Sequence, residues 1–186
     1  MLNMCLDLDI TDYATVDFTA LVDAIDAIGG VDINVTDEEI EYLNSYQISM
    51  VGKPDGTVNA LGEPNFTAKA GTDYIPVEHA GVQRLNGLQA TAYCRIRYVG
   101  SDFQRAERQR TVLMEAAKRA KEMSASSLNS IIDEVFPKVK TSFTTTELVG
   151  YAAKDASYNI VGNMGFPVDR VTGKMGKAGS CVIATN

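Results

Sequence analysis

The feature that most constrains the fold is a change of hydrophobic period between residues 13 and 35. The segment Tyr13–Phe18 predicts a strand. Apolar residues then recur at helical spacing up to the stop signal Gly29-Gly30, at Phe18, Leu21, Val22, Ile25 and Ile28. Val31, Ile33 and Val35 next alternate with polar residues, which is typical of a half-buried strand. Strand, helix and strand in one short stretch indicate an α/β fold in which both strands belong to one sheet and the helix packs against it.

Capping boxes mark the starts of three further helices. The box at Thr36–Glu39 opens a short helix that runs through Leu43, and the box at Ser101–Gln104 opens a long helix over about Phe103–Met123. The box at Thr144–Glu147 opens a helix in the last third of the chain. In each box the first side chain and the fourth can satisfy free backbone N–H groups of the first turn. These starts are therefore expected to be well defined.

Periodicity predicts the remaining elements. Helices are expected over Leu85–Cys94 and Ser127–Phe136, and short strands over Asn159–Val161 and Cys181–Ile183. Residues 49–76 are rich in Gly, Pro and Asn and show no clear period, which predicts a long loop of the kind that often carries function. No internal repeat or linker is present. We therefore expect residues 1–186 to form a single domain.

Composition is that of one globular domain and excludes several kinds of site. The 186 residues are 45% hydrophobic, and no apolar run approaches the roughly 18 residues of a membrane span. The three cysteines are widely separated, form no CxxC pair and are accompanied by a single histidine, His79; they are Cys5, Cys94 and Cys181. A zinc site of the Cys/His kind is nearly excluded, and no metal ligand is assigned. We expect the cysteines to be core or surface residues and His79 to be solvated.

Charge is distributed unevenly along the chain, whose net charge is −7. Residues Met1–Gly52 contain 11 acidic residues and no lysine or arginine. Residues Gly81–Lys121 contain nine basic residues against three acidic ones, and seven of the eight arginines of the chain. An acidic chain that concentrates arginine in one segment is expected to hold a compact, phosphate-like anion there. Nucleic acid is not an expected partner, because its binders usually carry a broader basic surface.

The candidate site combines a short segment with the helix that follows it. Arg95 and Arg97 are two residues apart in a segment expected to be extended or turning, so they point to one side. On the helix, Asp102, Arg105 and Gln109 fall on one stripe at i, i+3 and i+7. The helix start adds free N–H groups and the positive end of its dipole. Because each guanidinium fork can hold two phosphate oxygens, this arrangement predicts a pyrophosphate site.

Arg108 lies beside that stripe and is a further candidate. A structural interpretation stays open for each residue alone. Arginine is common on exposed helix faces, Asp102 could serve only at the N-cap, and Arg105 could pair with it locally. The whole arrangement favours an anion site, because so many arginines would otherwise repel one another with little acid nearby to balance them.

The same residues resemble a known family. Leu85–Arg97, followed by Asp102–Gln109, resembles the LytR-CpsA-Psr signature, which runs loosely L-x-G-x-x-A-x-x-Y-x-R-x-R and then D-x-x-R-x-x-R-Q. Upstream, Asp12-Tyr13, Val16–Phe18 and Asp26–Val31 are also similar to the family's strand and GGV elements. The resemblance covers about residues 7 to 123, and the last third fits only generally.

The resemblance implies a fold, an activity and a set of partners. The fold would be a three-layer αβα sandwich around a mixed β-sheet. The activity would be that of a magnesium-dependent phosphotransferase of cell wall biogenesis, which transfers glycan phosphate from a polyprenyl-pyrophosphate carrier to peptidoglycan and so makes teichoic acid or capsule linkages. By resemblance, the pyrophosphate would be bound by Arg95, Arg97, Arg105, Arg108 and Gln109, with Asp102 and Arg105 as the catalytic residues.

The sequence also departs from the family pattern. Family members carry an earlier half-domain with a magnesium-binding aspartate and an I-P-R-D-like stretch, and an N-terminal membrane anchor; none of these motifs occurs here. We therefore expect a sheet incomplete at its N-terminal side and a Mg²⁺ ligand outside this chain. The full-length protein would be extracytoplasmic and membrane-anchored, and the chain as given soluble. Whether this chain is itself an enzyme stays open.

Two alternatives remain. One is a catalytically incomplete fragment that only binds polyprenyl phosphate, and the absent half-domain makes it the more serious rival. The other is a regulatory protein, in keeping with the older interpretation of the family as transcriptional attenuators. The low pI of about 4.7 and the lack of a helix-turn-helix signature argue against it.

Overall fold

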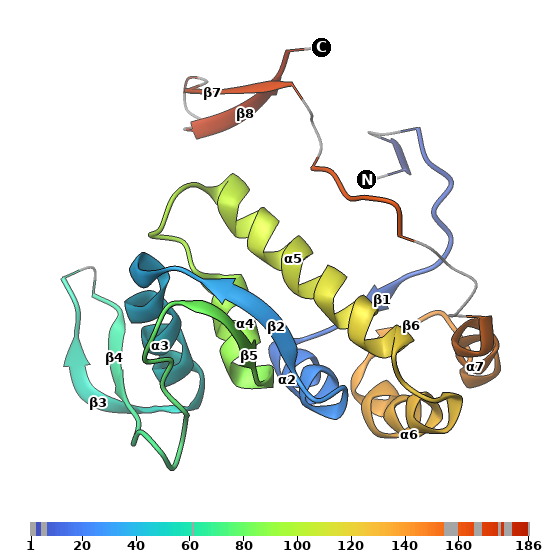
Figure 1. Ribbon diagram of the computed structural model, residues 1–186. Coiled ribbons are helices and arrows are strands. Elements are labelled where there is room, and N and C mark those ends of the chain that lie inside the picture. The colour runs from blue at the N-terminus through green and yellow to red at the C-terminus, as the bar shows by residue number, and fades with distance from the viewer. Residues whose placement is uncertain are drawn as a thin grey trace.

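The structure is a computed structural model, and it describes residues 3–4, 7–60, 62–154, 160–165, 169–174, 176 and 180–185. The α/β class expected from the sequence is confirmed, with helices and short antiparallel sheets along the chain (Figure 1). The described strands form four two-stranded sheets. None of the helices in the described ranges combines the length and the apolar character needed to cross a bilayer.

A two-stranded sheet and four helices enclose the core. Strand β2 (Val31–Val35) pairs antiparallel with β5 (Gly81–Leu85), with Val31 opposite Leu85. The three valine and isoleucine side chains of β2 are buried and the two polar side chains between them are not, as the alternation predicted. The core cluster joins this buried face to residues of the surrounding helices, including Ile25, Leu43, Ala90 and Ile96.

Helices α2 (Phe18–Ala27), α3 (Asp37–Val51) and α4 (Gly87–Arg95) form most of the helical part of this core. The capping box expected at the start of α3 is present, and the helix runs further than expected because Leu43 and Gln47 continue its buried stripe. Helix α4 lies close to α2 at Gly87, where an added Cβ would come within 2.1 Å of the Val22 carbonyl oxygen. Only glycine allows this approach.

Helix α5 (Asp102–Lys121) lies against β2 and contributes Val112 to the core. Its capping box is formed as expected, with the Ser101 N–H donating to Gln104 Oε1 at 2.8 Å. The turn before it ends at Gly100, whose φ is +83° and whose hydrogen faces the Gln104 side chain, so that no Cβ would fit. This turn connects the end of α4 to the start of α5 and carries Arg97.

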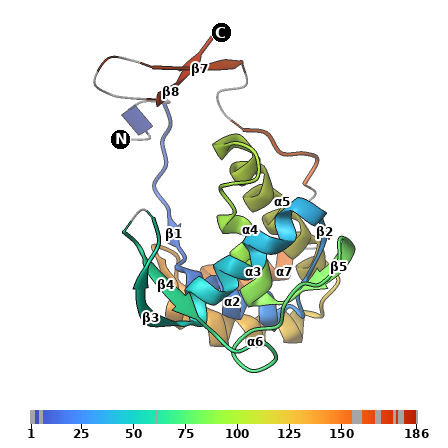
Figure 2. The ribbon, with the colours of Figure 1, turned by 90° about the vertical axis from the view of Figure 1, so that its left-hand side faces the viewer.

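The long loop expected over residues 49–76 is wrong in its central part. Strands β3 (Lys53–Val58) and β4 (Pro64–Thr67) pair there as an antiparallel hairpin beside α3 (Figures 1 and 2). The Asn59 side chain closes its turn by accepting from the Glu63 N–H at 3.0 Å. Periodicity failed to predict the hairpin because β3 is exposed along its whole length, so neither face carries an apolar stripe.

The placement of the first strand also differs from expectation. Strand β1 (Ala14–Thr15) pairs with β6 (Lys140–Thr141), not with β2, so the expectation of one sheet containing Tyr13–Phe18 and Val31–Val35 is wrong. The strand is short because Asp17 caps α2, accepting from the Ala20 N–H at 2.8 Å, and the extended backbone ends there. Between α5 and α7 (Thr145–Lys154) lie α6 (Ala125–Val135) and the 3₁₀ turn η1 (Phe136–Lys138).

The C-terminal part of the described chain ends in the hairpin of β7 (Arg170–Lys174) and β8 (Ser180–Ala184), beyond the N-terminal end of α5 (Figure 1). The strand expected at Cys181–Ile183 is confirmed. Of the other expected strand, Asn159 lies outside the described residues, and Ile160 and Val161 are in irregular structure. Cys94 is buried, Cys181 is partly buried, His79 is exposed, and Cys5 lies outside the described residues.

Candidate anion-binding pocket

A cavity of about 1380 Å³ opens where α4, α5 and the turn between them meet α2, α3 and the β3–β4 hairpin. One part of its lining is polar and includes Arg95, Arg97, Arg105 and Gln109. Another part is apolar, with Phe18, Leu21, Ile48, Phe66, Val112 and Leu113 among its residues. The cavity therefore suits a ligand with an anionic group and an apolar chain.

Arg95 is the last residue of α4, so it is helical rather than in the extended or turning segment expected from the sequence. Its guanidinium lies 4.8 Å from the centre of the Phe18 ring and 5.3 Å from that of the Tyr46 ring. Both distances are within the range of cation–π attraction. The two rings hold the guanidinium at the pocket wall without neutralising its charge.

Arg97 lies in the turn after α4 and is exposed. No carboxylate within the described ranges forms an ion pair with it or with Arg95, and the ion pairs in these ranges involve other lysines and arginines. Gln109, one α5 residue that lines the pocket, donates from Nε2 to the Cys94 carbonyl oxygen at 3.4 Å. Arg97 thus keeps its hydrogen-bond donors available for an anion.

Arg105 and Asp102 form a pair at the start of α5. Arg105 Nη2 lies 3.3 Å from Asp102 Oδ1, and the Asp102 side chain is 77% exposed. Arg105 lines the pocket, whereas Asp102 is outside its lining. The contact gives Asp102 a way to orient Arg105, and its exposure keeps the pair weak.

The structure brings four of the six predicted site residues into the pocket lining; Asp102 lies outside it, paired with Arg105, and Arg108 is separated from it. Arg95, Arg97, Arg105 and Gln109 line one pocket, as predicted, although Arg95 reaches it from the end of a helix and not from an extended segment. Arg108 does not reach it, because its side chain is only 7% exposed and is paired with Glu39. Arg108 precedes Gln109 on α5, and the rotation of the helix between these neighbouring positions turns the Arg108 side chain into the core instead of the pocket.

The pocket arginines act electrostatically on Tyr46 of α3. Burial raises the pKa of the Tyr46 hydroxyl, and the nearby Tyr98 adds to the rise, while the charges of Arg95, Arg97 and Arg105 oppose it. Three guanidinium groups therefore act on one point of the lining. Burial also raises the pKa of the Cys94 thiol to about 12, so this lining residue is neutral near pH 7 and is not an activated nucleophile.

Sequence reasoning missed the hairpin and aromatic side of the pocket. Asn59, Glu63 and Asn65 line it from the β3–β4 hairpin. Tyr42 and Tyr98 also line it, with ring centres 5.8 Å apart. The available signal was the Asn59–Gly62 stretch between two extended runs, which is typical of a hairpin turn.

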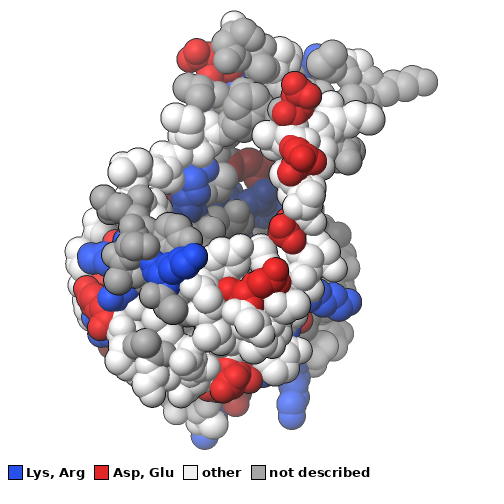
Figure 3. Space-filling view, turned by 90° about the vertical axis from the view of Figure 1, so that its right-hand side faces the viewer, with Lys and Arg blue, Asp and Glu red and all other residues white. Residues whose placement is uncertain are grey.

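Acidic and basic side chains are partly separated on one face of the molecule (Figure 3). In Figure 3 acidic side chains follow one another along one side of the view, and lysine and arginine side chains gather beside a hollow next to them. Within the described part of the chain, no group of three or more His, Cys, Asp or Glu side chains is close enough to hold a metal ion.

Comparison with known proteins gives a family match over nearly the whole chain. The LytR_cpsA_psr family matches residues 1–177. A curated relative is Biofilm regulatory protein A of Streptococcus mutans, which is 27% identical over 155 residues. That match covers 79% of this chain and 32% of the relative, so the chain spans about a third of its length.

Solved structures share the fold. Protein gbs0355 of Streptococcus agalactiae aligns with a TM-score of 0.65 and 23% identity, over 97% of this chain and 54% of that one. TagV of Bacillus subtilis aligns with a TM-score of 0.55 and 23% identity, over 84% and 50%. A structure of TagT bound to LIIa-WTA, a wall teichoic acid ligand, gives 0.58 and 21%, over 83% and 49%; B. subtilis TagT is also among the matches. The chain spans about half of these structures.

Proposed function

The chain belongs to the LytR_cpsA_psr family, and we propose that its α4–α5 pocket binds a polyprenyl-(pyro)phosphate-linked glycan as part of a cell-wall glycopolymer transferase. The observation that carries the proposal is one cavity with Arg95, Arg97 and Arg105 at one part of its wall and apolar side chains at another. A lipid diphosphate has the same two parts, an anionic head and an apolar chain. The structurally similar TagT is bound to LIIa-WTA, a wall teichoic acid ligand, which is the kind of glycopolymer that this proposal requires.

The residues divide the work of binding as follows. Arg97, exposed and without a carboxylate partner among the described residues, would hold two phosphate oxygens with its guanidinium fork. Arg95, held by aromatic rings, would supply charge from the pocket wall. Gln109 would add a neutral amide contact. Arg105, oriented by Asp102, would face the phosphate group that is transferred. Phosphoryl transfer requires mainly such charge neutralisation and positioning.

Magnesium belongs to the proposal through the family resemblance alone. It would neutralise phosphate charge, and the resemblance assigns its aspartate ligand to an earlier half-domain of the family. Peptidoglycan as the acceptor, a membrane anchor in the full-length protein and an extracytoplasmic location are proposed on the same basis.

The test is binding of farnesyl diphosphate, a short polyprenyl diphosphate, measured by isothermal titration calorimetry. We expect saturable binding that weakens as ionic strength rises, because guanidinium–phosphate contacts provide much of it. Farnesol, which lacks the diphosphate, should bind far more weakly. Equal affinity for the two compounds would contradict the proposal, and so would the absence of binding at low salt.

A second candidate function is lipid binding without transfer. The observation that favours it is that the pocket lining supplies guanidinium groups and apolar side chains, which suffice to bind a lipid phosphate without transferring it. Magnesium-dependent phosphate release from the lipid diphosphate separates the two candidates. Turnover by this chain alone would exclude the binding-only function, whereas binding without turnover would support it.

A further inference from the structure

The buried ion pair of Glu39 and Arg108 lies behind the pocket and is not accounted for by ligand binding. Arg108 Nε donates to Glu39 Oε1 at 2.7 Å, and both side chains are 7% exposed. A charged pair removed from water to this extent is retained only where further hydrogen bonds satisfy it. The remaining contacts of both residues therefore indicate what the pair does.

Arg108 uses its other nitrogens on the turn that carries Arg97. Nη1 donates to the Ile96 carbonyl oxygen at 3.3 Å, and Nη2 donates to the Val99 carbonyl oxygen at 2.8 Å. These carbonyls stand on either side of Arg97 and Tyr98. One guanidinium thus fixes both ends of the four-residue turn 96–99.

Glu39 connects the same guanidinium to helix α3. While Oε1 accepts from Arg108, Oε2 accepts from the Thr36 N–H at 3.0 Å and completes the capping box of that helix. One turn further along α3, Tyr42 contacts the Tyr98 ring at 5.8 Å between centres. Helix α3 therefore holds the turn at two points, through Glu39 with Arg108 and through Tyr42 with Tyr98.

We propose that Glu39 and Arg108 form a clamp that positions Arg97 for anion binding, so that Arg108 is a positioning residue and does not contact the ligand. The clamp fixes the backbone on both sides of Arg97 and leaves its side chain facing the pocket. Arginine is required at position 108 because its planar fork reaches a carboxylate and two carbonyls at once. The single ammonium group of lysine cannot do so.

The decisive experiment is a double-mutant cycle with Arg108→Lys and Arg97→Ala, read as affinity for farnesyl diphosphate; it rests on the proposed function. Lysine keeps the charge beside Glu39 but loses the fork. We expect Arg108→Lys to weaken binding about tenfold to hundredfold, as displacement of a binding group does. In the Arg97→Ala background the same change should cost almost nothing, because the residue it positions is absent. If Arg108→Lys lowers the affinity by the same factor in the wild-type and the Arg97→Ala backgrounds, the clamp is overturned.

A second readout does not depend on the ligand. Amide hydrogen exchange in the unliganded protein should be faster in Arg108→Lys at Ile96 and Ser101, whose N–H groups are hydrogen-bonded at the two ends of the turn, while the amides of α2 and β2 keep their protection. Unchanged exchange in the turn would overturn the clamp even if affinity fell. If the wild-type chain fails to bind farnesyl diphosphate, the proposed function fails, and the exchange data still decide about the clamp.

The controls separate local from global effects. Arg84→Lys is the matched substitution, because Arg84 is paired with Asp32 on the surface and does not line the pocket; it should leave affinity and exchange in the turn unchanged. Glu39→Gln keeps the size of the side chain and one acceptor for Arg108, so it should show a smaller version of both effects. If Arg108→Lys proves too unstable to measure, Glu39→Gln replaces it in the cycle with the same two outcomes.

Discussion

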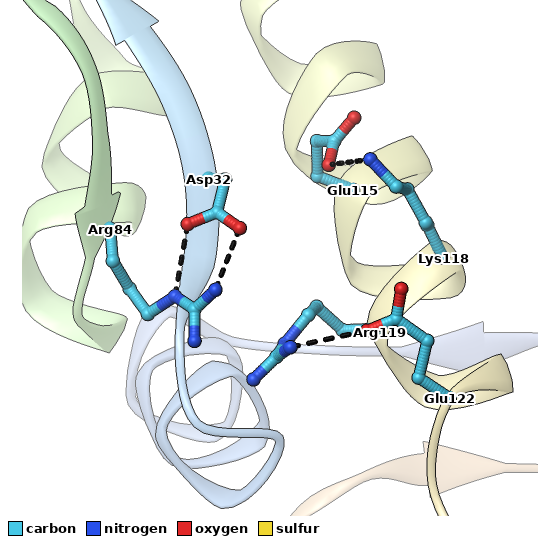
Figure 4. A network of polar contacts seen from close by, with 6 residues as sticks. All are labelled: Asp32, Arg84, Glu115, Lys118, Arg119 and Glu122. Carbon is cyan, nitrogen blue, oxygen red and sulfur yellow. Dashed lines mark hydrogen bonds and ion pairs between the residues drawn. The ribbon is translucent and has the colours of Figure 1, made fainter.

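Two groups of arginines lie within residues 81–121 and differ in whether the fold gives them a carboxylate partner. In the network between β2 and α5, Arg84 bonds Asp32 through two nitrogens at 2.9 and 2.7 Å, and Arg119 pairs with Glu122 at 3.2 Å (Figure 4). In the pocket, Arg95 and Arg97 have no carboxylate partner among the described residues. Arginine density in the sequence indicates the region of the pocket, whereas the distribution of carboxylates in the fold decides which arginines are left without a partner there.

The largest expected effect comes from removing a carboxylate that is buried rather than exposed. Glu39→Ala would leave Arg108 buried without its partner, which typically destabilises a protein by about 3–5 kcal/mol. Chemical denaturation measures the loss. The double variant Glu39→Ala, Arg108→Met should recover part of it, since no unpaired charge remains, while the Thr36 N–H and the Ile96 and Val99 carbonyls still lack their partners. A single variant as stable as the wild type would show that this pair does not differ from the surface pairs.

The next effect concerns the pocket group alone. Arg97→Ala should weaken binding of farnesyl diphosphate by about 1–3 kcal/mol, as expected for a lost charge-assisted contact. The melting temperature should barely change, because the Arg97 side chain is exposed. The matched control Arg84→Ala should leave the affinity unaltered. An equal loss of affinity in both variants would mean that overall positive charge, not the pocket, governs binding.

A change of pH should affect the stability of the two regions in opposite directions, with a loss at alkaline pH from the pocket and a loss at acid pH from the surface network. Burial raises the pKa of the Cys94 thiol to about 12, so the folded state keeps a proton that the unfolded chain releases near pH 9. The stabilisation this provides is complete below about pH 9 and is lost as pH rises towards 12, with about 1 kcal/mol lost near pH 10. Denaturation midpoints measured from pH 7 to 10.5 test this. Cys94→Ala should flatten the alkaline decline, and an unchanged decline would contradict the assignment.

The smallest effect is expected in the surface network, on the acid side. The hydrogen bond from Arg84 lowers the pKa of the Asp32 carboxyl, so this pair contributes above the unfolded-state pKa, near 4, and its contribution is lost as pH falls below it. Because both side chains are well exposed, Asp32→Asn should shift the denaturation midpoint only slightly, and far less than Glu39→Ala does. Added salt should reduce even this shift. A loss as large as that of Glu39→Ala would remove the distinction between the two groups.

Local signals predicted the elements that local physics determines. Capping boxes placed the starts of α3, α5 and α7, and alternation placed β2, because each depends on residues within a few positions of one another. The hairpin β3–β4 escaped prediction because it has no buried face. The pairing of β1 with β6 joins residues more than 120 positions apart, and nothing in either short segment encodes that choice.

The sequence by itself determined the α/β class, the family resemblance and four residues that share the pocket, Arg95, Arg97, Arg105 and Gln109. These follow from period, order and spacing, which the chain carries along its length. Only the tertiary structure decided the roles of individual arginines. Glu39 lies 69 positions from Arg108, and it is their burial together that removes this arginine from the pocket lining and attaches it to the turn carrying Arg97. The availability of a charge depends on which opposite charge folding brings within 3 Å, and that proximity is a property of the fold.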